Sequence, residues 1–338
     1  MAIPGSSLYY PKNHPVRVVV LLPCFNEATA IEDVIKDFQH AIPEATVYVY
    51  DNNSTDDTVM IARRTGAIVQ SEPFQGKGNV VRRMFADIDA DIYVLADGDG
   101  TYRAQDAPRL IKYLLENNFD MVTGIRKETE QEAYRRGHRL GNRALTKTVA
   151  FLFGRPVKDM LSGYRIFSRR FVKSFPALSA GFEIETELTV HALEMRMKTG
   201  DMKTPYGART AGTQSKLRTY RDGIRIGRII LKLLKEEKPA FLFGVLALLL
   251  TLLSLGFGLP VVMEFIRTGL VPRLPTALLA TGLMLLAFLT LALGLILESI
   301  SHSRREMRRL HYLAYPAPGP PFGSIPGLRR DIGIKSLT

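Results

Sequence analysis

The chain has 338 residues, with 45 Lys and Arg against 33 Asp and Glu, which gives a formal net charge of +12. Its single cysteine, Cys24, excludes an intrachain disulfide, and with it the small secreted scaffolds and cysteine-rich zinc modules. The length suffices for one large or two ordinary domains, and an ordinary 23% of charged residues argues against a disordered chain.

The positive charge is unevenly distributed. Residues 1–125 carry 11 basic and 17 acidic side chains, a net charge of −6, whereas residues 126–173 carry 13 and 4, a net charge of +9. Residues 203–238 and 299–338 add +7 and +5 on either side of a long apolar stretch. A nucleic-acid-binding protein is one class with such a charge. Basic blocks beside apolar runs instead indicate a membrane surface, and no nucleic-acid partner is expected.

The N-terminal part of the chain has the pattern of an α/β domain. Residues 1–15 lack the basic start and apolar core of a signal peptide and are expected to form an extension. From residue 16, apolar runs of strand length alternate with segments of helical period, which is typical of a parallel sheet with crossover helices. We therefore predict one large domain over residues 16–220. Its predicted strands are residues 16–22, 46–50, 92–96 and 120–123, and its predicted helices are residues 28–40, 55–65, 77–88 and 106–116.

Polar residues follow three of these predicted strands, at residues 23–27, 51–56 and 97–99. The carboxyl ends of parallel strands form one edge of the sheet, where ligands of such folds bind. Asp97 and Asp99 suit a divalent cation that already holds diphosphate oxygens. A solvated turn or a helix cap is the alternative for each motif alone. Together the three motifs could hold a base, a ribose and a metal-bound diphosphate.

Two apolar stretches, residues 240–263 and 274–297, each contain 24 residues without a charged side chain. A helix of that length is about 36 Å long, enough to cross a hydrocarbon layer of about 30 Å. Two buried core helices are the alternative. We predict a hairpin of two transmembrane helices over residues 239–298. Basic residues are denser outside the pair than in its connection, which predicts that both termini and the large domain lie in the cytoplasm.

Amphipathic segments accompany this hairpin. In residues 223–238 the isoleucines and leucines lie largely on one side of a helix and the basic residues elsewhere, so residues 221–238 are predicted to form an interfacial helix. Residues 142–153 form either a similar helix or an ordinary core helix. Residues 299–338 are expected to be a basic cytoplasmic tail, irregular from Tyr315 onward.

Six motifs, taken in order, resemble those of family 2 glycosyltransferases, most closely the polyprenyl-phosphate (dolichol- or undecaprenyl-phosphate) group. The resemblance covers roughly residues 16–235 and implies a GT-A fold, with a Rossmann-like nucleotide-binding half and an acceptor half. The motifs are Pro-Cys-Phe-Asn-Glu at 23–27, Asp-Asn-Asn-Ser-Thr-Asp at 51–56, Gly-Lys-Gly at 76–78, Asp-Gly-Asp at 97–99, Ser-Gly-Tyr-Arg at 162–165 and Ser-Lys-Leu at 215–217.

The resemblance implies a nucleotide-sugar donor and a Mg²⁺ or Mn²⁺ ion held by Asp97 and Asp99. Family members usually have two successive acids where this chain has Asp51 and Asn52, which leaves open whether the donor carries uridine or guanosine. The donor-binding residues implied are Pro23, Phe25, Glu27, Tyr50, Asp51, Asn52, Lys77, Asp97, Gly98, Asp99, Thr101, Arg209 and Lys216.

The resemblance also implies an inverting hexosyltransferase with a polyprenyl-phosphate acceptor. A lipid phosphate is already an anion near neutral pH, so it can attack the anomeric carbon without a general base. Asp97 and Asp99 on the donor side, with Arg126 and Arg136 at the acceptor phosphate, are then the expected catalytic residues. Arg139 is added because it lies close to them in the sequence. For each arginine, a solvated basic face against anionic lipid is the alternative.

Two other functions stay open. A transferase acting on a sugar hydroxyl of a lipid-linked saccharide would need a base, for which Glu183 and Glu185 are candidates. With Glu187, these are interpreted as acids at the start of a helix, favoured by its dipole. The other function is a non-catalytic membrane subunit of the same fold. A processive synthase is disfavoured because its Gln-x-x-Arg-Trp motif needs a tryptophan, and the chain has none. The oligomeric state is left open.

Overall fold

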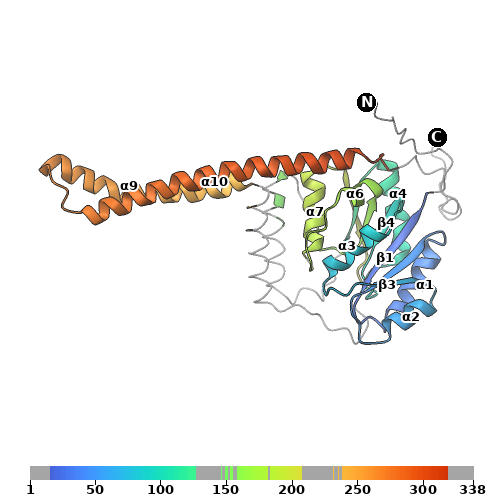
Figure 1. Cartoon of the computed structure of the whole chain (residues 1–338). Coiled ribbons are helices and arrows are strands. Elements are labelled where there is room, and N and C mark those ends of the chain that lie inside the picture. The colour runs from blue at the N-terminus through green and yellow to red at the C-terminus, as the bar shows by residue number, and fades with distance from the viewer. Residues whose placement is uncertain are drawn as a thin grey trace, which may run out of the picture. The chain divides into compact units, whose positions relative to one another are not determined.

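The computed structural model describes residues 16–126, 158–181, 183–207 and 238–318, with a few single residues between these ranges. The chain divides into two compact units. One unit is formed by Met1–Asp222 with Arg308–Thr338 and contains a seven-stranded sheet, and the other is Gly223–Met307 and contains long helices (Figure 1).

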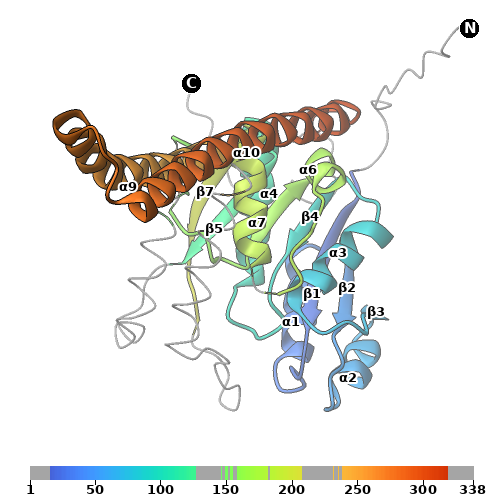
Figure 2. The same ribbon diagram turned by 60° about the vertical axis from the view of Figure 1, so that its left-hand side comes forward.

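The sheet has the order β3-β2-β1-β4-β6-β5-β7 (Figure 2). Only β6 runs antiparallel to its neighbours, β4 and β5, and every other pair is parallel. The predicted α/β fold with a mostly parallel sheet is therefore confirmed. The strands are β1 (Val18–Cys24), β2 (Thr46–Asp51), β3 (Ile68–Ser71), β4 (Ile92–Leu95), β5 (Met121–Arg126), β6 (Arg165–Ser168) and β7 (Thr199–Thr204).

Helices cover both faces of the sheet. Side chains of α1, α2 and α4 enter one hydrophobic cluster, and those of α3, α6 and α7 enter the other. All four predicted helices and all four predicted strands are present, and α7 begins at the acids interpreted as a helix start, whereas β3, β6, β7 and α6 were not predicted. The helices are α1 (Ile31–Ala41), α2 (Thr58–Arg64), α3 (Lys77–Asp87), α4 (Ala107–Asn117), α6 (Arg169–Ser174) and α7 (Ile184–Glu194), with a short 3₁₀ turn η1 at Ala104–Asp106.

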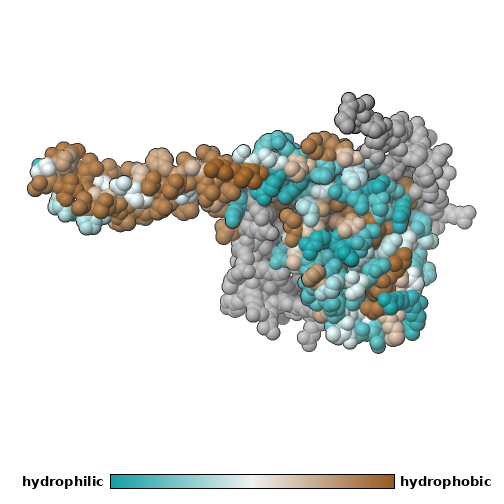
Figure 3. Space-filling model, viewed as in Figure 1, coloured by the Kyte–Doolittle hydropathy of each residue, from teal (hydrophilic) through white to brown (hydrophobic). Residues whose placement is uncertain are grey.

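The second unit contains two long apolar helices, α9 (Pro239–Thr268) and α10 (Leu274–Leu313). In their most apolar windows only 11% and 17% of the residues are buried, whereas a core helix of a globular domain is mostly buried. Their surface is accordingly hydrophobic over most of the visible face (Figure 3). The hydroxyl of Ser254 donates to the carbonyl of Ala280 (2.7 Å), and the carboxylate of Glu298 accepts the N–H of Ala240 (3.3 Å). These two bonds join the helices at separate levels.

Helix α10 does not end at residue 298, where the hairpin was predicted to end. Its last turns, residues 308–313, belong to the unit that contains the sheet. Tyr312 is buried there, and its hydroxyl donates to Asp120 at 3.0 Å. Arg308 forms an ion pair with Glu194, and Arg309 donates to the carbonyl of Met195 at 3.1 Å. Two arginines of the predicted basic tail are thus bound to protein groups.

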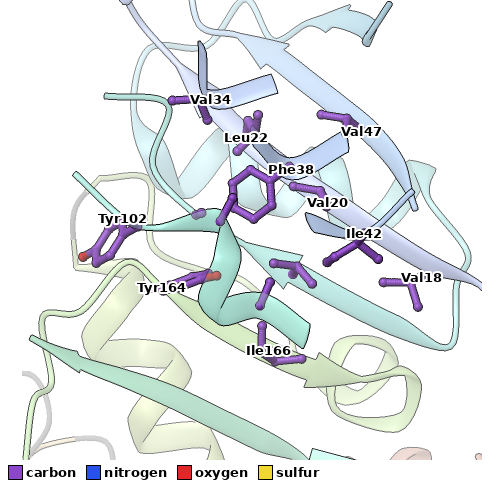
Figure 4. Packing of buried hydrophobic residues seen from close by; sticks show 14 of the residues in the cluster. Val18, Val20, Leu22, Val34, Phe38, Ile42, Val47, Tyr102, Tyr164 and Ile166 are labelled. Carbon is purple, nitrogen blue, oxygen red and sulfur yellow. The ribbon is translucent and has the colours of Figure 1, made fainter. Parts of the chain in front are cut away.

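Strand β1 lies inside the sheet, between β2 and β4, and is buried on both faces. Residues 18–22 are all at most 2% exposed, because helices cover both faces of a parallel strand and both sets of side chains must be apolar. On one face Val20 and Leu22 pack with Phe38 of α1 (Figure 4). Phe38 meets the ring of Tyr164 edge to face, with 6.5 Å between the ring centroids.

Several predicted features lie outside the described residues. They are the extension at residues 1–15, most of the segments 142–153 and 221–238, the tail beyond residue 318, and the four predicted site residues Arg136, Arg139, Arg209 and Lys216.

Candidate active site

The carboxyl ends of β1, β2 and β4 meet at one edge of the sheet, as the strand pattern predicted. Cys24 pairs with Asp51 in the β1–β2 register, and Leu21 pairs with Leu95 of β4. The N–H of Asn52 donates to the carbonyl of Cys24 at 2.9 Å, so the pairing continues past the end of β2. The three polar motifs are therefore neighbours in space.

Side-chain hydrogen bonds fasten the segment after β1 to the segment after β2. The N–H of Asn26 donates to the hydroxyl of Ser54 (2.9 Å), and its side-chain oxygen accepts the N–H of Thr55 (2.8 Å). The N–H of Glu27 donates to the hydroxyl of Thr58 at 2.9 Å. Helix α1 is preceded by Ala30, so Asn26 is not its cap. The polar residues after β1 instead fix the edge where ligands of this fold class bind.

Two of the predicted donor-binding residues, Tyr50 and Asp51, are neighbours in β2 and point to opposite faces of the sheet. Asp51 is 6% exposed, and its carboxylate accepts the N–H of Ser54 at 3.2 Å. Tyr50, one position earlier, belongs to the opposite core cluster, and its hydroxyl donates to Asp87 at 3.1 Å. Successive side chains of a strand point to opposite faces. The expectation that Tyr50 lies beside the nucleotide is therefore not supported by the position of its side chain.

The Asp97-Gly98-Asp99 turn follows β4 directly. Asp99 is 5% exposed, and its Oδ1 accepts both the N–H (3.2 Å) and the hydroxyl (2.6 Å) of Thr101. A Cβ atom at position 98 would lie only 2.5 Å from the sulfur of Cys24. Glycine fits here because β1 packs closely against the turn. Thr101, predicted to be near, orients Asp99.

Lys77, the first residue of α3, lies between two carboxylates. Its ammonium contacts Asp97 Oδ1 and lies 2.6 Å from Glu185 Oε1, and the lysine side chain is 9% exposed. Burial alone would lower the pKa of Lys77, but the two carboxylates outweigh it and raise the pKa above its ordinary value. Glu185 Oε2 is buried and has no hydrogen-bond partner among the described residues. Glu185 does lie in the first turn of α7, as expected, and it also binds the Lys77 ammonium.

Arg126, at the end of β5, is paired with an acid that sequence reasoning missed. Its Nε and Nη2 donate to the two oxygens of Asp159 at 2.9 and 3.0 Å, and its guanidinium lies 5.5 Å from the centre of the Tyr206 ring. Burial opposes the charge, yet the hydrogen bonds to Asp159 raise the pKa of Arg126. Asp159 stands three residues before the Ser-Gly-Tyr-Arg motif, the one sequence signal that could have found it. The positive charge of Arg126 is therefore compensated by the carboxylate of Asp159.

Comparison with known proteins identifies the family. Residues 19–175 match glycosyl transferase family 2. The chain is 35% identical over 305 residues to the glycosyltransferase AglJ of Haloferax volcanii, in a match that covers 88% of this chain and 99% of AglJ. The chain belongs to glycosyltransferase family 2. It is thus a nucleotide-sugar glycosyltransferase.

A further relative and a solved structure extend the comparison. This glycosyltransferase is 28% identical over 222 residues to the dolichyl-phosphate hexose transferase of Haloferax volcanii, covering 65% of this chain and 95% of the relative. It also shares its fold with glucosyl-3-phosphoglycerate synthase of Mycobacterium tuberculosis, solved with Mn²⁺, UDP-glucose and phosphoglyceric acid. That match has a TM-score of 0.54 at 24% identity and covers 65% of this chain and 79% of the synthase.

The Ser-Gly-Tyr-Arg motif of this glycosyltransferase serves the architecture of the site. Arg165 is fully buried and donates to the carbonyls of Ser162 (2.9 Å) and Met160 (2.8 Å) and to the hydroxyl of Thr189 (2.9 Å). Burial lowers its pKa. Arg165 thereby holds the segment that begins with Asp159, the partner of Arg126.

The strand-end acids of the glycosyltransferase fit a cation that arrives with its substrate. The described residues contain no group of three or more His, Cys, Asp and Glu side chains placed to hold a metal ion. Mg²⁺ usually takes only one or two protein carboxylates and completes its shell with phosphate oxygens and water. Asp97 and Asp99, two carboxylates at one strand end, match that requirement.

Proposed function

We propose that this protein is an inverting hexosyltransferase that moves a sugar from a nucleotide-sugar to a polyprenyl phosphate at the membrane surface. The observation that carries the proposal is the pair of helices α9 and α10, whose large apolar side chains are exposed along most of their length. A glycosyltransferase in the same chain as such a hairpin is suited to a lipid acceptor. The similarity to a dolichyl-phosphate hexose transferase supports the same acceptor class.

The donor side of the proposal uses the edge formed by β1, β2 and β4. Asp51 and the segment after β1 would hold the nucleoside, while Asp97 and Asp99 would hold Mg²⁺ or Mn²⁺ together with the donor diphosphate. The ion, when bound, neutralises the negative charge that develops on the leaving nucleoside diphosphate. The Mn²⁺ in the mycobacterial synthase is consistent with this choice. Lys77, at the same edge, adds a fixed positive charge.

The acceptor side needs positioning more than proton transfer. A polyprenyl phosphate is ionised near neutral pH, so the protein has only to orient it and to exclude water. Arg126 is proposed to contact this phosphate; its pairing with Asp159 fixes the direction of the guanidinium. Arg136 and Arg139 are proposed for the same phosphate, and Arg209 and Lys216 for the donor diphosphate. Both termini and the catalytic domain are proposed to face the cytoplasm.

The test is a transfer assay on the purified chain in detergent. Polyprenyl phosphate, Mn²⁺ and a panel of radiolabelled UDP- and GDP-hexoses should give a lipid product that mild acid cleaves. Product with one sugar of the panel would identify the donor. The proposal fails if no donor gives this product while a lipid-linked saccharide is extended instead.

The alternative, transfer to a sugar hydroxyl, is kept because Glu185, which shares the Lys77 ammonium with Asp97, has a buried oxygen that none of the described residues binds. Glu185→Gln separates the two functions. An amide still accepts a hydrogen bond from Lys77 but cannot act as a base. Under the proposal the variant keeps activity within about tenfold, because general-base catalysis, worth about 10²- to 10⁴-fold, is not being used. A larger loss in a folded variant would favour the hydroxyl acceptor.

A further inference from the structure

The side-chain amide of Asn52 forms hydrogen bonds with the loop that precedes α3. Asn52 is 4% exposed. Its Nδ2 donates to the carbonyls of Glu72 (2.9 Å) and Phe74 (2.8 Å), and its Oδ1 accepts the N–H of Gly76 at 2.7 Å. Both N–H donors of the amide are therefore used, and its oxygen accepts one hydrogen bond. No donor remains for a nucleotide base.

The loop is held from the other side by the segment before α7. A Cβ atom at Gly76, where φ is +132°, would lie 2.3 Å from the carbonyl oxygen of Ala180, so this contact admits only glycine. The N–H of Asn79 donates to the same oxygen at 3.2 Å. That segment is fixed in turn by Glu187, whose carboxylate accepts the N–H groups of Leu178 (2.8 Å) and Ser179 (2.7 Å).

Lys77 stands between these two supports, and its ammonium reaches Asp97 and Glu185. We propose that Asn52 and Glu187 are positioning residues, which clamp the Gly76-Lys77-Gly78 segment from opposite sides and so place the Lys77 ammonium at the donor diphosphate. The inference deepens the proposed function and rests on its donor half alone. Asn52 then has no part in choosing the donor base, contrary to what its place in the Asp51-Asn52 motif suggested.

The contacts of Asn52 give a physical reason for an amide, rather than a second acid, at this position. A carboxylate at position 52 could still accept the N–H of Gly76, but it could not donate to the carbonyls of Glu72 and Phe74. It would also be a buried charge beside the Glu72 carboxylate, which accepts the N–H of Phe74 at 2.9 Å. In this chain the amide is needed to shape the loop.

A double-mutant cycle tests the inference through ligand binding. The variants are Asn52→Asp, Lys77→Met and the double variant, with Asn117→Asp as the matched control, because exposed Asn117 also donates to a backbone carbonyl. Isothermal titration would measure the dissociation constants of UDP and GDP, with and without Mn²⁺. Each single change should weaken binding about tenfold, as expected for loss of a charge-assisted contact. The double variant should bind no more weakly than Lys77→Met alone, and the control should stay within about twofold of the parent.

Three results overturn the inference. They are additive losses in the double variant, unchanged binding in Asn52→Asp, and a changed ratio of UDP to GDP affinity in Asn52→Asp. If Asn52→Asp does not fold, Glu187→Gln replaces it in the cycle. Glu187→Gln keeps one acceptor oxygen and should therefore lose less affinity. Combined with Lys77→Met, it should cause no further loss. Additive losses in this second cycle would also overturn the inference. Failure of the lipid assay would leave these binding results unaffected, so the two proposals fail separately.

Discussion

A buried acid lies at each of the two edges of the sheet, and the two acids differ in how many hydrogen bonds their carboxylate oxygens accept. At the edge formed by the carboxyl ends of β1, β2 and β4, Glu185 has one oxygen on Lys77, and its other oxygen has no hydrogen-bond partner in the described part of the chain. At the opposite edge, Asp120 is fully buried and accepts from Ser168 (2.9 Å), from Arg170 through two nitrogens, and from Tyr312 (3.0 Å). A saturated carboxylate holds the structure together, whereas an incomplete set can receive a ligand. A buried carboxylate therefore stabilises the structure at one edge and is available to a ligand at the other.

The sharpest way to test this contrast is to remove an acid from the incomplete edge. Asp99→Ala should lower transfer activity at least about 1,000-fold, equivalent to about 4 kcal/mol, because the donor diphosphate loses its metal contact. The unfolding temperature should change little. Transfer assays and thermal scans check both statements, and Asp89→Ala, at an exposed ion pair, is the control.

Removing the acid from the saturated edge should have the reverse signature. Asp120→Asn breaks a buried pair and should lower the free energy of unfolding by about 3 kcal/mol. The rate per folded molecule should stay near that of the parent. Denaturant titration measures the first quantity and active-site titration normalises the second; a catalytic loss without a stability loss would contradict the division of roles.

A smaller effect is expected in the pH dependence of stability, from His191 in the last turn of α7. Burial, with help from Arg308, lowers the pKa of His191 to about 3. Between that value and about 6.5, the unfolded chain binds a proton that the native chain does not, so stability falls as the pH falls. From pH 7 to pH 5 the loss from this group should be about 2 kcal/mol. The His191→Gln variant should show a flatter slope over this range, and an unchanged slope would refute the assignment.

The smallest expected effect concerns the end of α10. Tyr312→Phe removes one hydroxyl bond to Asp120 and keeps the ring that lies 4.7 Å from the Arg170 guanidinium and 4.8 Å from that of Arg309. The free energy of unfolding should fall by about 1 kcal/mol. An equal loss in Asp120→Asn and in the double variant with Tyr312→Phe would show that the two groups act through one contact.

The sequence predicted the strands and helices that carry strong periodicity, and the meeting of three polar motifs at one edge. It did not predict β3 or β7, which are edge strands with mixed side chains, or β6, which has only four residues. Their pairing depends on contacts distant in the chain, and local propensity does not encode these.

Within the site, residue types were easier to predict than partners. Asp97, Asp99 and Thr101 lie together as expected, and Lys77 joins them through Asp97. The pairing of Arg126 with Asp159, 33 residues apart, depends on the fold and has no local signal. The motif did not indicate that Tyr50 and Asp51 point to opposite faces, with the Tyr50 hydroxyl bound to Asp87.

The two hydrogen bonds within the helical hairpin have a mechanical consequence. Because Ser254 is joined to Ala280 and Ala240 to Glu298, α9 cannot slide along α10 without breaking both bonds. Under the proposed membrane anchoring, the apolar length of the hairpin would therefore be fixed, and the pair would adapt to a thinner bilayer by tilting together rather than by shortening.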